Sequence, residues 1–302
     1  MTIDSTPNAC HSKVVMVGVD GSAAASDACS WAAWLAAKTD AHLITASAWL
    51  PHQAEGSPEA MAERRAAAES MLDDEWSRPA RLVGVSPRPL LLDGTPEVLL
   101  EAAEHEHADL LVVGSRGAGG LAGLHVGSVA HHLAHHTVRP LAIVPAPAAH
   151  DHPGTIVVGV DGSAGSAAAV RWCATTAAAL SAEVIAVTAF EPFLEWVPDS
   201  DPRNWRRDLG RHMDEWIEPL LLASVQVQRV IVRDIHPVAA IADTARGQAQ
   251  LIVVGTHGRG GFPGMRVGGV ALQLVHHAAL PVVLVPGPGH DASSAASTGR
   301  IS

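Results

Sequence analysis

The sequence predicts an α/β protein of two tandem domains, each with a five-stranded parallel sheet that carries helices on both faces. The first observation behind this prediction is an internal repeat, because Val-Gly-Val-Asp-Gly-Ser occurs at 17–22 and again at 158–163. The second is the alternation of apolar strand-like runs with helical segments in each copy, which is typical of parallel βαβ units. The third is length, since 302 residues suffice for two domains that each bury a core.

The two copies keep one spacing throughout. Val-Val-Gly at 112–114 recurs at 253–255, and Trp31 matches Trp172, so each pair is separated by 141 positions. Duplication explains a constant spacing better than coincidence does. The predicted organisation is a first domain at 13–145, a linker at 146–154, a second domain at 155–286 and flexible termini at 1–12 and 287–302.

The elements of the first copy follow from local patterns. An apolar strand at 14–19 ends at Asp20, and Ser22 is the expected N-cap of an alanine-rich helix that continues to about residue 38. Thr95-Pro96-Glu97 predicts the start of another helix, with a cap, a proline at the first position and an acidic first turn. The remaining expected elements are strands at 43–49, 88–92, 110–113 and 141–144 and helices at 59–76, 95–107 and 128–137. The second copy repeats this series from 156 to 285.

Composition excludes several classes of protein. The formal net charge is -11, so the basic face that a nucleic-acid binder needs is missing. No apolar run approaches the roughly 20 residues that cross a bilayer. The first 13 residues lack the basic and apolar regions of a secretion signal, which predicts a cytoplasmic protein. Cys10, Cys29 and Cys173 share no spacing and are expected to be free thiols.

A glycine-rich motif occurs in both copies after the fourth strand. Gly114-Ser115-Arg116-Gly117 is followed by nine residues and Gly127-Ser128, and 255–258 is followed by nine residues and Gly268-Gly269. Glycines allow close approach of the backbone to an anion, and the helix that opens after residue 127 presents unpaired N–H groups. The pattern therefore predicts a phosphate cradle. Asp20, which ends the first strand, is expected to face the same crevice if the first and fourth strands are neighbours, where it would accept from a ribose hydroxyl or hold a metal.

These residues together resemble the universal stress protein family in its tandem form. The resemblance rests on the Asp after the first strand, the Gly-x2-Gly-x9-Gly-Ser spacing and the proline-led last strand, and it covers 14–145 and 156–286. It implies a Rossmann-like fold of the adenine nucleotide alpha hydrolase type, ATP as the ligand, and a regulatory role in stress adaptation, dormancy or growth control. Mg²⁺ or Mn²⁺ would accompany the nucleotide. Family members also dimerise through the final strand, so 141–144 and 282–285 are expected to pair within this chain; further assembly into a homodimer stays open.

The resemblance also implies roles for individual residues. The aspartates would lie by ribose or metal, the alanines beside adenine, and the remaining positions around ribose and phosphates. The residues so assigned in the first copy are Asp20, Ala48, Val113, Gly114, Arg116, Gly117, Gly127, Ser128 and Val129. Those in the second copy are Asp161, Ala189, Val254, Gly255, His257, Gly258, Gly268, Gly269 and Val270.

The second copy departs from this pattern at Gly269, where a hydroxyl residue is expected. A hydrogen bond worth about 0.5–1.5 kcal/mol is lost there. The second site is therefore expected to bind ATP more weakly, unless Arg259 or Arg266 compensates.

Other patterns favour simpler interpretations. No Gly-Lys-Ser/Thr occurs, which excludes a P-loop, and 117–122 fits the dinucleotide pattern but follows the wrong strand. The histidines at 131, 132, 135 and 136 have metal-ligand spacing, yet the second copy keeps only two, so surface or capping roles are favoured. Ser22 and Ser163 are expected to be caps rather than nucleophiles, and the tryptophans at 31, 34 and 172 core residues.

Three functions are compatible with these patterns. The first is an ATP-binding regulatory protein with an unknown protein partner, for which no catalytic residue is expected. The second is an enzyme that hydrolyses ATP slowly, autophosphorylates or transfers a nucleotidyl group, with Asp20 holding a metal. The third is an interaction module that binds another adenine nucleotide such as cyclic AMP.

Overall fold

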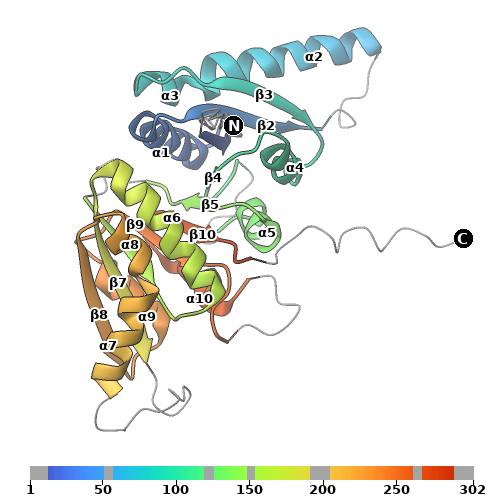
Figure 1. Ribbon diagram of the computed structural model, residues 1–302. Helices are drawn as coiled ribbons and strands as arrows, with labels where there is room; N and C mark the ends of the chain where they lie inside the picture. Colours follow the sequence, from blue (N-terminus) through green and yellow to red (C-terminus); the bar gives the residue numbers. More distant parts are fainter. Residues whose placement is uncertain are drawn as a thin grey trace, which may run out of the picture.

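The computed structural model describes residues 13–50, 57–118, 126–147, 154–190, 205–260 and 267–288. The described strands form one sheet in the order β3-β2-β1-β4-β5-β10-β9-β6-β7-β8, so the two repeats lie side by side (Figure 1). The strands of the first repeat are β1 (Val14–Gly18), β2 (His42–Trp49), β3 (Arg88–Asp93), β4 (Leu110–Gly114) and β5 (Leu141–Val144). Those of the second are β6 (Thr155–Gly159), β7 (Glu183–Phe190), β8 (Val227–Arg233), β9 (Leu251–Gly255) and β10 (Val282–Val285).

Helices cover both faces of this sheet, as the sequence predicts. The first repeat contributes α1 (Ala23–Thr39), α2 (Pro58–Met71), the π-helical turn η2 (Leu72–Trp76), α3 (Arg78–Leu82), α4 (Val98–His105) and α5 (Ser128–His136). The second contributes α6 (Ala164–Leu180), α7 (Trp205–Trp216), α8 (Glu218–Leu222), α9 (Pro237–Ala245) and α10 (Gly269–His277).

Alternate residues of each strand enter two separate hydrophobic cores. Val15 and Val17 pack in the core that also holds α1, α3, α6 and α8 residues, whereas Met16 packs in the core of α4, α5, α9 and α10. This period of two follows from the pleat of a strand that is buried on both faces. The predicted five-stranded parallel sheet of each repeat is thus confirmed.

The repeats meet through their last strands. All strand pairs within a repeat are parallel, whereas β5 and β10 pair antiparallel, with Ala142 opposite Val283. Both strands are fully buried apolar segments, which fits a position at the centre of a ten-stranded sheet.

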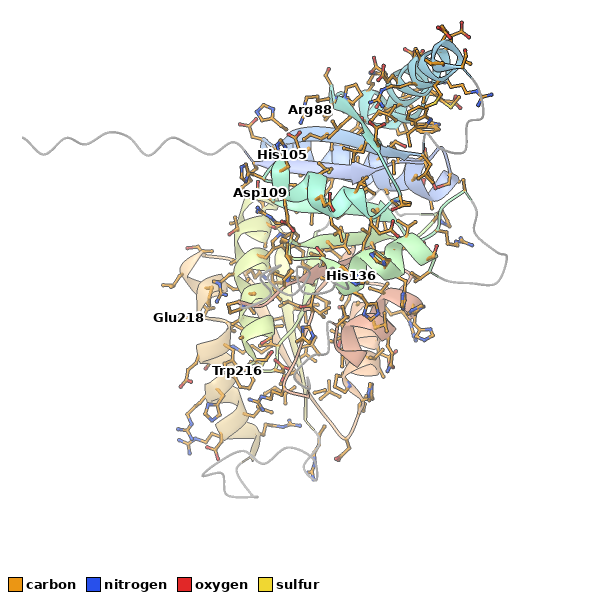
Figure 2. The ribbon with its side chains drawn as sticks, turned by 90° about the vertical axis from the view of Figure 1, so that its right-hand side faces the viewer. Arg88, His105, Asp109, His136, Trp216 and Glu218 are labelled. Atoms are coloured by element: carbon orange, nitrogen blue, oxygen red, sulfur yellow. The ribbon has the colours of Figure 1, made fainter. Side chains whose placement is uncertain are left out.

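The side chain of Asp109, just before β4, holds the start of β1 in place. Asp109 Oδ2 accepts a hydrogen bond from the Val14 N–H at 2.8 Å, and Arg88 and His105 lie at the same end of the repeat (Figure 2). Gln250 Oε1 repeats this bond in the second copy, with the Thr155 N–H at 3.0 Å. Because the equivalent contact recurs with a different side chain, the duplication preserves geometry rather than residue type.

The expected helix at 59–76 is wrong in its last part. Helix α2 ends at Met71, and a π turn comes after it, in which the Ser77 N–H reaches the Leu72 carbonyl at 3.0 Å. Pro79 has no N–H to continue such a ladder, so the short helix α3 begins anew, with this proline in its first turn.

The expected cap at Thr95 is also wrong. Helix α4 begins at Val98, and the carbonyls of Thr95, Pro96 and Glu97 accept from the N–H groups three residues on, at 3.0, 3.2 and 3.0 Å. This tight 3₁₀-like entry uses the Thr95 carbonyl, so the first turn does not depend on a side-chain cap.

Candidate functional site

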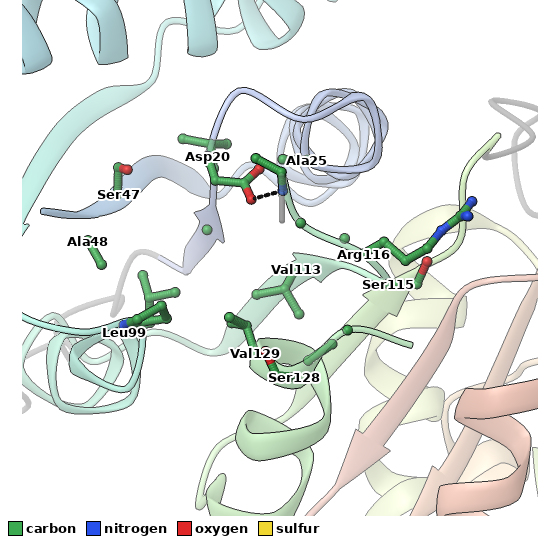
Figure 3. Close-up of a pocket in the computed structure, with 18 residues that line it drawn as sticks. Asp20, Ala25, Ser47, Ala48, Leu99, Val113, Ser115, Arg116, Ser128 and Val129 are labelled. Carbon is green, nitrogen blue, oxygen red and sulfur yellow. Dashed lines mark hydrogen bonds between the residues drawn. The ribbon is translucent and has the colours of Figure 1, made fainter. Parts of the chain in front are cut away.

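A cavity of about 450 Å³ lies where β1 and β4 end and α5 begins (Figure 3). The two strands are hydrogen-bonded neighbours, as the crevice prediction requires. Cavities of this size are typical of small-molecule sites. The nine residues expected in the first site all line it: Asp20, Ala48, Val113, Gly114, Arg116, Gly117, Gly127, Ser128 and Val129.

The Asp20 carboxylate fastens the glycine-rich loop to the end of β1. Its Oδ1 accepts from the Ser22 N–H at 3.0 Å, and its Oδ2 accepts from the Ala118 N–H at 2.8 Å, the bond drawn dashed in Figure 3. A methyl group on Gly117 would come within 2.6 Å of Oδ2. Glycine at this position therefore lets the loop approach the carboxylate without moving it.

Gly114 is required for a different reason. A Cβ here would lie 2.7 Å from the backbone carbonyl of Ala24, in the first turn of α1. Ser22 caps that helix, because its Oγ accepts from the Ala25 N–H at 3.1 Å, which confirms the predicted cap. The glycine thus lets β4 approach the start of α1, and the loop leaves the strand at the floor of the cavity.

The start of α5 forms the polar wall of the cavity. Gly127 is the N-cap in extended conformation and provides no side chain to satisfy the first N–H groups. The Gly127 N–H itself donates to the Ser115 carbonyl at 2.7 Å, which holds the helix start against the loop. Ser128 and Val129 of the first turn line the cavity. Unpaired N–H groups and the helix dipole favour an anion at this position.

The opposite wall is mostly apolar, and two of its residues, Leu99 and Ser47, were not singled out from the sequence. Leu99 of α4 and Ser47 of β2 line the cavity beside Ala48 and Val113. Leu99 is 5% exposed, so α4 is fixed in place by its own packing. An apolar wall opposite a row of N–H groups suits a ligand with a flat, weakly polar end and an anionic end. Pro96, Ala118 and Ala130 are further lining residues that were missed.

The second repeat builds an equivalent cavity of about 430 Å³. Asp161 accepts from the N–H groups of Ser163 and Arg259, each at 2.9 Å, and a Cβ on Gly258 would lie 2.5 Å from its Oδ2. The duplication therefore extends to the individual hydrogen bonds of the loop. All nine residues expected here line the cavity: Asp161, Ala189, Val254, Gly255, His257, Gly258, Gly268, Gly269 and Val270.

More polar side chains line the second cavity than the first. Arg259 occupies the position of Ala118, and its guanidinium lies 5.1 Å from the ring centre of Trp216. His236, the N-cap of α9, and Gln273 of α10 also line this cavity, and the sequence singled out neither. Arg266, the other arginine considered for the second site, lies outside the described residues.

The four histidines of α5 pair one turn apart along the helix. The rings of His132 and His136 are stacked 4.1 Å apart, whereas those of His131 and His135 are 4.6 Å apart and tilted by 50°. Burial lowers the pKa of His135, and neighbouring histidine charge lowers it further. Among the residues that the structure describes, no group of three or more His, Cys, Asp or Glu side chains is placed to hold a metal ion.

The described cysteines are buried thiols. Burial raises the pKa of Cys29 to about 11 and that of Cys173 to about 12, and Cys10 lies outside the described residues. Trp31 is buried in the core as expected, and Trp34 and Trp172 pack partly buried against it. No helix in the described parts of the chain is long and apolar enough to span a bilayer.

Comparison with known proteins agrees with this architecture. The model of the universal stress protein family matches residues 11–145 and 153–286. A universal stress protein of Mycobacterium tuberculosis is 34% identical over 192 residues; this match spans 58% of the chain and only 58% of the relative. Another from the same organism is 29% identical over 296 residues, which cover 89% of this chain and 96% of that one.

A solved structure supports the fold independently. The crystal structure of a universal stress protein from Archaeoglobus fulgidus superposes with a TM-score of 0.71 at 18% identity, covering 91% of this chain and 99% of that chain. The family model accounts for each of the two repeats separately. The chain therefore belongs to the universal stress protein family and carries two of its domains in tandem.

Proposed function

We propose that the two cavities bind ATP and that nucleotide occupancy regulates a protein partner in stress adaptation, dormancy or growth control. The observation that carries this proposal is the duplicated pairing of an aspartate-fastened glycine loop with an open helix start. In the first repeat, Gly117 and Ser128 face the cavity from these two elements, and Asp20 fastens the loop. Phosphates suit the N–H groups, and adenine suits the apolar wall at Ala48 and Leu99.

A divalent cation would reach this site mainly through the nucleotide. Asp20 is the one carboxylate among the described lining residues of the first cavity, and both of its oxygens already accept backbone N–H groups. These bonds favour a structural role for the side chain. Mg²⁺ or Mn²⁺ would therefore be held by phosphate oxygens, with Asp20 as at most one ligand. The same bonds weaken the case for an enzyme that uses Asp20 as its metal anchor.

The direct test is to identify what the purified chain carries. Denaturing extraction followed by mass spectrometry should release ATP at up to two molecules per chain. Calorimetric titration of nucleotide-free protein should then show ATP binding, and saturation at 100 times Kd should stabilise the fold by about 2.7 kcal/mol. A chain that binds no adenine nucleotide at millimolar concentration contradicts the proposal, and preference for cyclic AMP would replace ATP as the ligand.

A matched pair of variants separates binding from folding. Gly117→Val and Gly258→Val place side chains against the carboxylates of Asp20 and Asp161, so each should remove one binding event. Gly210→Ala adds a methyl group in open space in α7, of which no described residue lines either cavity, and should leave both events intact. Loss of binding in the Gly210→Ala control as well would mean that the valines do not act through the cavities, which contradicts the assignment of the binding sites.

A further inference from the structure

The second cavity contains a polar side chain that has no counterpart in the first. Gln273 lies four residues after Gly269 in α10, and its side chain lines the second cavity. Side chains of a helix lean toward its N-terminus, so the residue at i+4 covers the position at i. A Cβ on Gly269 would lie 4.0 Å from Gln273 Nε2, with no other heavy atom within 4 Å apart from chain neighbours and the backbone of the helix itself. Because Gly269 has no side chain, the Gln273 amide can occupy the space beside the first turn of α10.

The equivalent pair in the first repeat is arranged differently. Ser128 lines the first cavity from the first turn of α5, whereas His132, one turn later, lines a neighbouring hollow with His136. The His132 ring stacks on that of His136 at 4.1 Å, and His132 is not among the described residues that line the first cavity. A serine–histidine pair in one repeat therefore corresponds to a glycine–glutamine pair in the other.

The chemistry of the amide suits the place where it lies. Gln273 is neutral and offers two N–H donors on a long side chain, whereas the Ser128 hydroxyl offers one. The start of α10 has Gly268 as its cap and no side-chain cap bond, so its first N–H groups face the same space. Donors that converge from the backbone and from an amide fit phosphate oxygens.

We propose that Gln273 Nε2 binds the phosphate chain of the nucleotide in the second cavity and takes over the part of the Ser128 hydroxyl. This inference rests on the proposed function of the cavities. It makes Gln273 a specificity residue, because the amide distinguishes ATP from adenosine. It also removes the reason to expect weaker binding at the second site, since the donor lost at Gly269 is supplied from one turn further along the helix.

The test measures ATP and adenosine binding by calorimetry on a Gly117→Val parent, in which only the second cavity is open. In this parent, Gln273→Leu should weaken ATP binding about tenfold and leave adenosine binding unchanged within about twofold. Gln273→Glu, which places a negative charge against phosphate, should weaken ATP binding more strongly. Gly269→Ser added to Gln273→Leu should restore most of the ATP affinity. His132→Leu, at the equivalent position of the first repeat, should have no effect on the second cavity.

The outcomes distinguish a wrong role for Gln273 from a wrong assignment of the second cavity as a nucleotide site. If the parent binds ATP and Gln273→Leu binds it equally well, the role of Gln273 is wrong and the nucleotide site stands. If the folded parent binds no ATP, the nucleotide function of the second cavity fails and the inference fails with it. Should Gly117→Val not fold, the Gln273 variants are titrated in the otherwise native chain with a two-site fit, and only one of the two affinities should change.

Discussion

The contact between Gly117 and Asp20 predicts a strong coupling that can be measured without any ligand. In Gly117→Ala, the new methyl group would lie 2.6 Å from Asp20 Oδ2 and 3.8 Å from its Cγ, and these are the only heavy atoms within 4 Å apart from chain neighbours. Such overpacking costs about 1–3 kcal/mol. The whole cost is therefore expected to come from one carboxylate.

Removal of that carboxylate has its own cost. Asp20→Ala eliminates the bonds to the Ser22 and Ala118 N–H groups, at 3.0 and 2.8 Å. Hydrogen bonds to charged groups contribute about 1.5–3 kcal/mol each. Because Asp20 is exposed, its two hydrogen bonds together should contribute about 1–3 kcal/mol. In the double variant the methyl group added at position 117 meets no carboxylate, so its cost should vanish. The double variant should then be about as stable as Asp20→Ala alone.

Urea unfolding of the four proteins at pH 7, followed by circular dichroism, checks this cycle. A coupling free energy of about 1–3 kcal/mol in the stabilising direction is expected, well above the roughly 0.5 kcal/mol scatter of independent sites. Gly260→Ala, which meets open space, should be additive with Asp20→Ala. Additive effects of Gly117→Ala and Asp20→Ala would refute the account of why this loop needs glycine.

Three further predictions concern the buried thiols and a helix. Because burial raises the pKa of Cys29 to about 11 and of Cys173 to about 12, both thiols should resist iodoacetamide at pH 8 and react at once after unfolding in urea. Because the folded-state pKa of Cys29 lies above its ordinary value of 9.0, the stability that the protonated buried thiol contributes should be full below pH 9 and be lost as the pH rises through 11. Urea unfolding at a series of pH values measures this loss. Gly210→Ala in α7, where nothing lies within 4 Å of the added methyl group, should raise the free energy of unfolding by about 0.5–1 kcal/mol.

The sequence predicted most of the fold because the patterns it used are local or duplicated. The run that ends at Asp20 and the cap at Ser22 depend on a few adjacent residues, and both are confirmed. The site residues that the family resemblance implied all line one of the two cavities, because they lie at strand ends and helix starts that a parallel sheet brings to the same crevice. Their roles toward ATP stay a prediction.

The errors and omissions have a common physical origin. The π turn before Ser77 and the tight entry into α4 at Thr95 depend on how helices dock, which periodicity does not encode. Leu99, His236 and Gln273 enter the cavities from helices, and the direction of a helical side chain follows from packing. One signal was available for Gln273, since its position four residues after a glycine at a helix start lets it cover that glycine.

The antiparallel junction between β5 and β10 determines how the two cavities are placed. Within each repeat the cavity lies at the carboxyl ends of parallel strands, and the junction reverses the strand direction between the repeats. The first and second cavities therefore lie toward opposite ends of the strands, although α4 and α5 of the first repeat and α9 and α10 of the second pack in one core on the same face of the sheet. No described residue lines both cavities. The second cavity can therefore have the Gly269–Gln273 pair in place of the Ser128 hydroxyl without any change to the lining of the first.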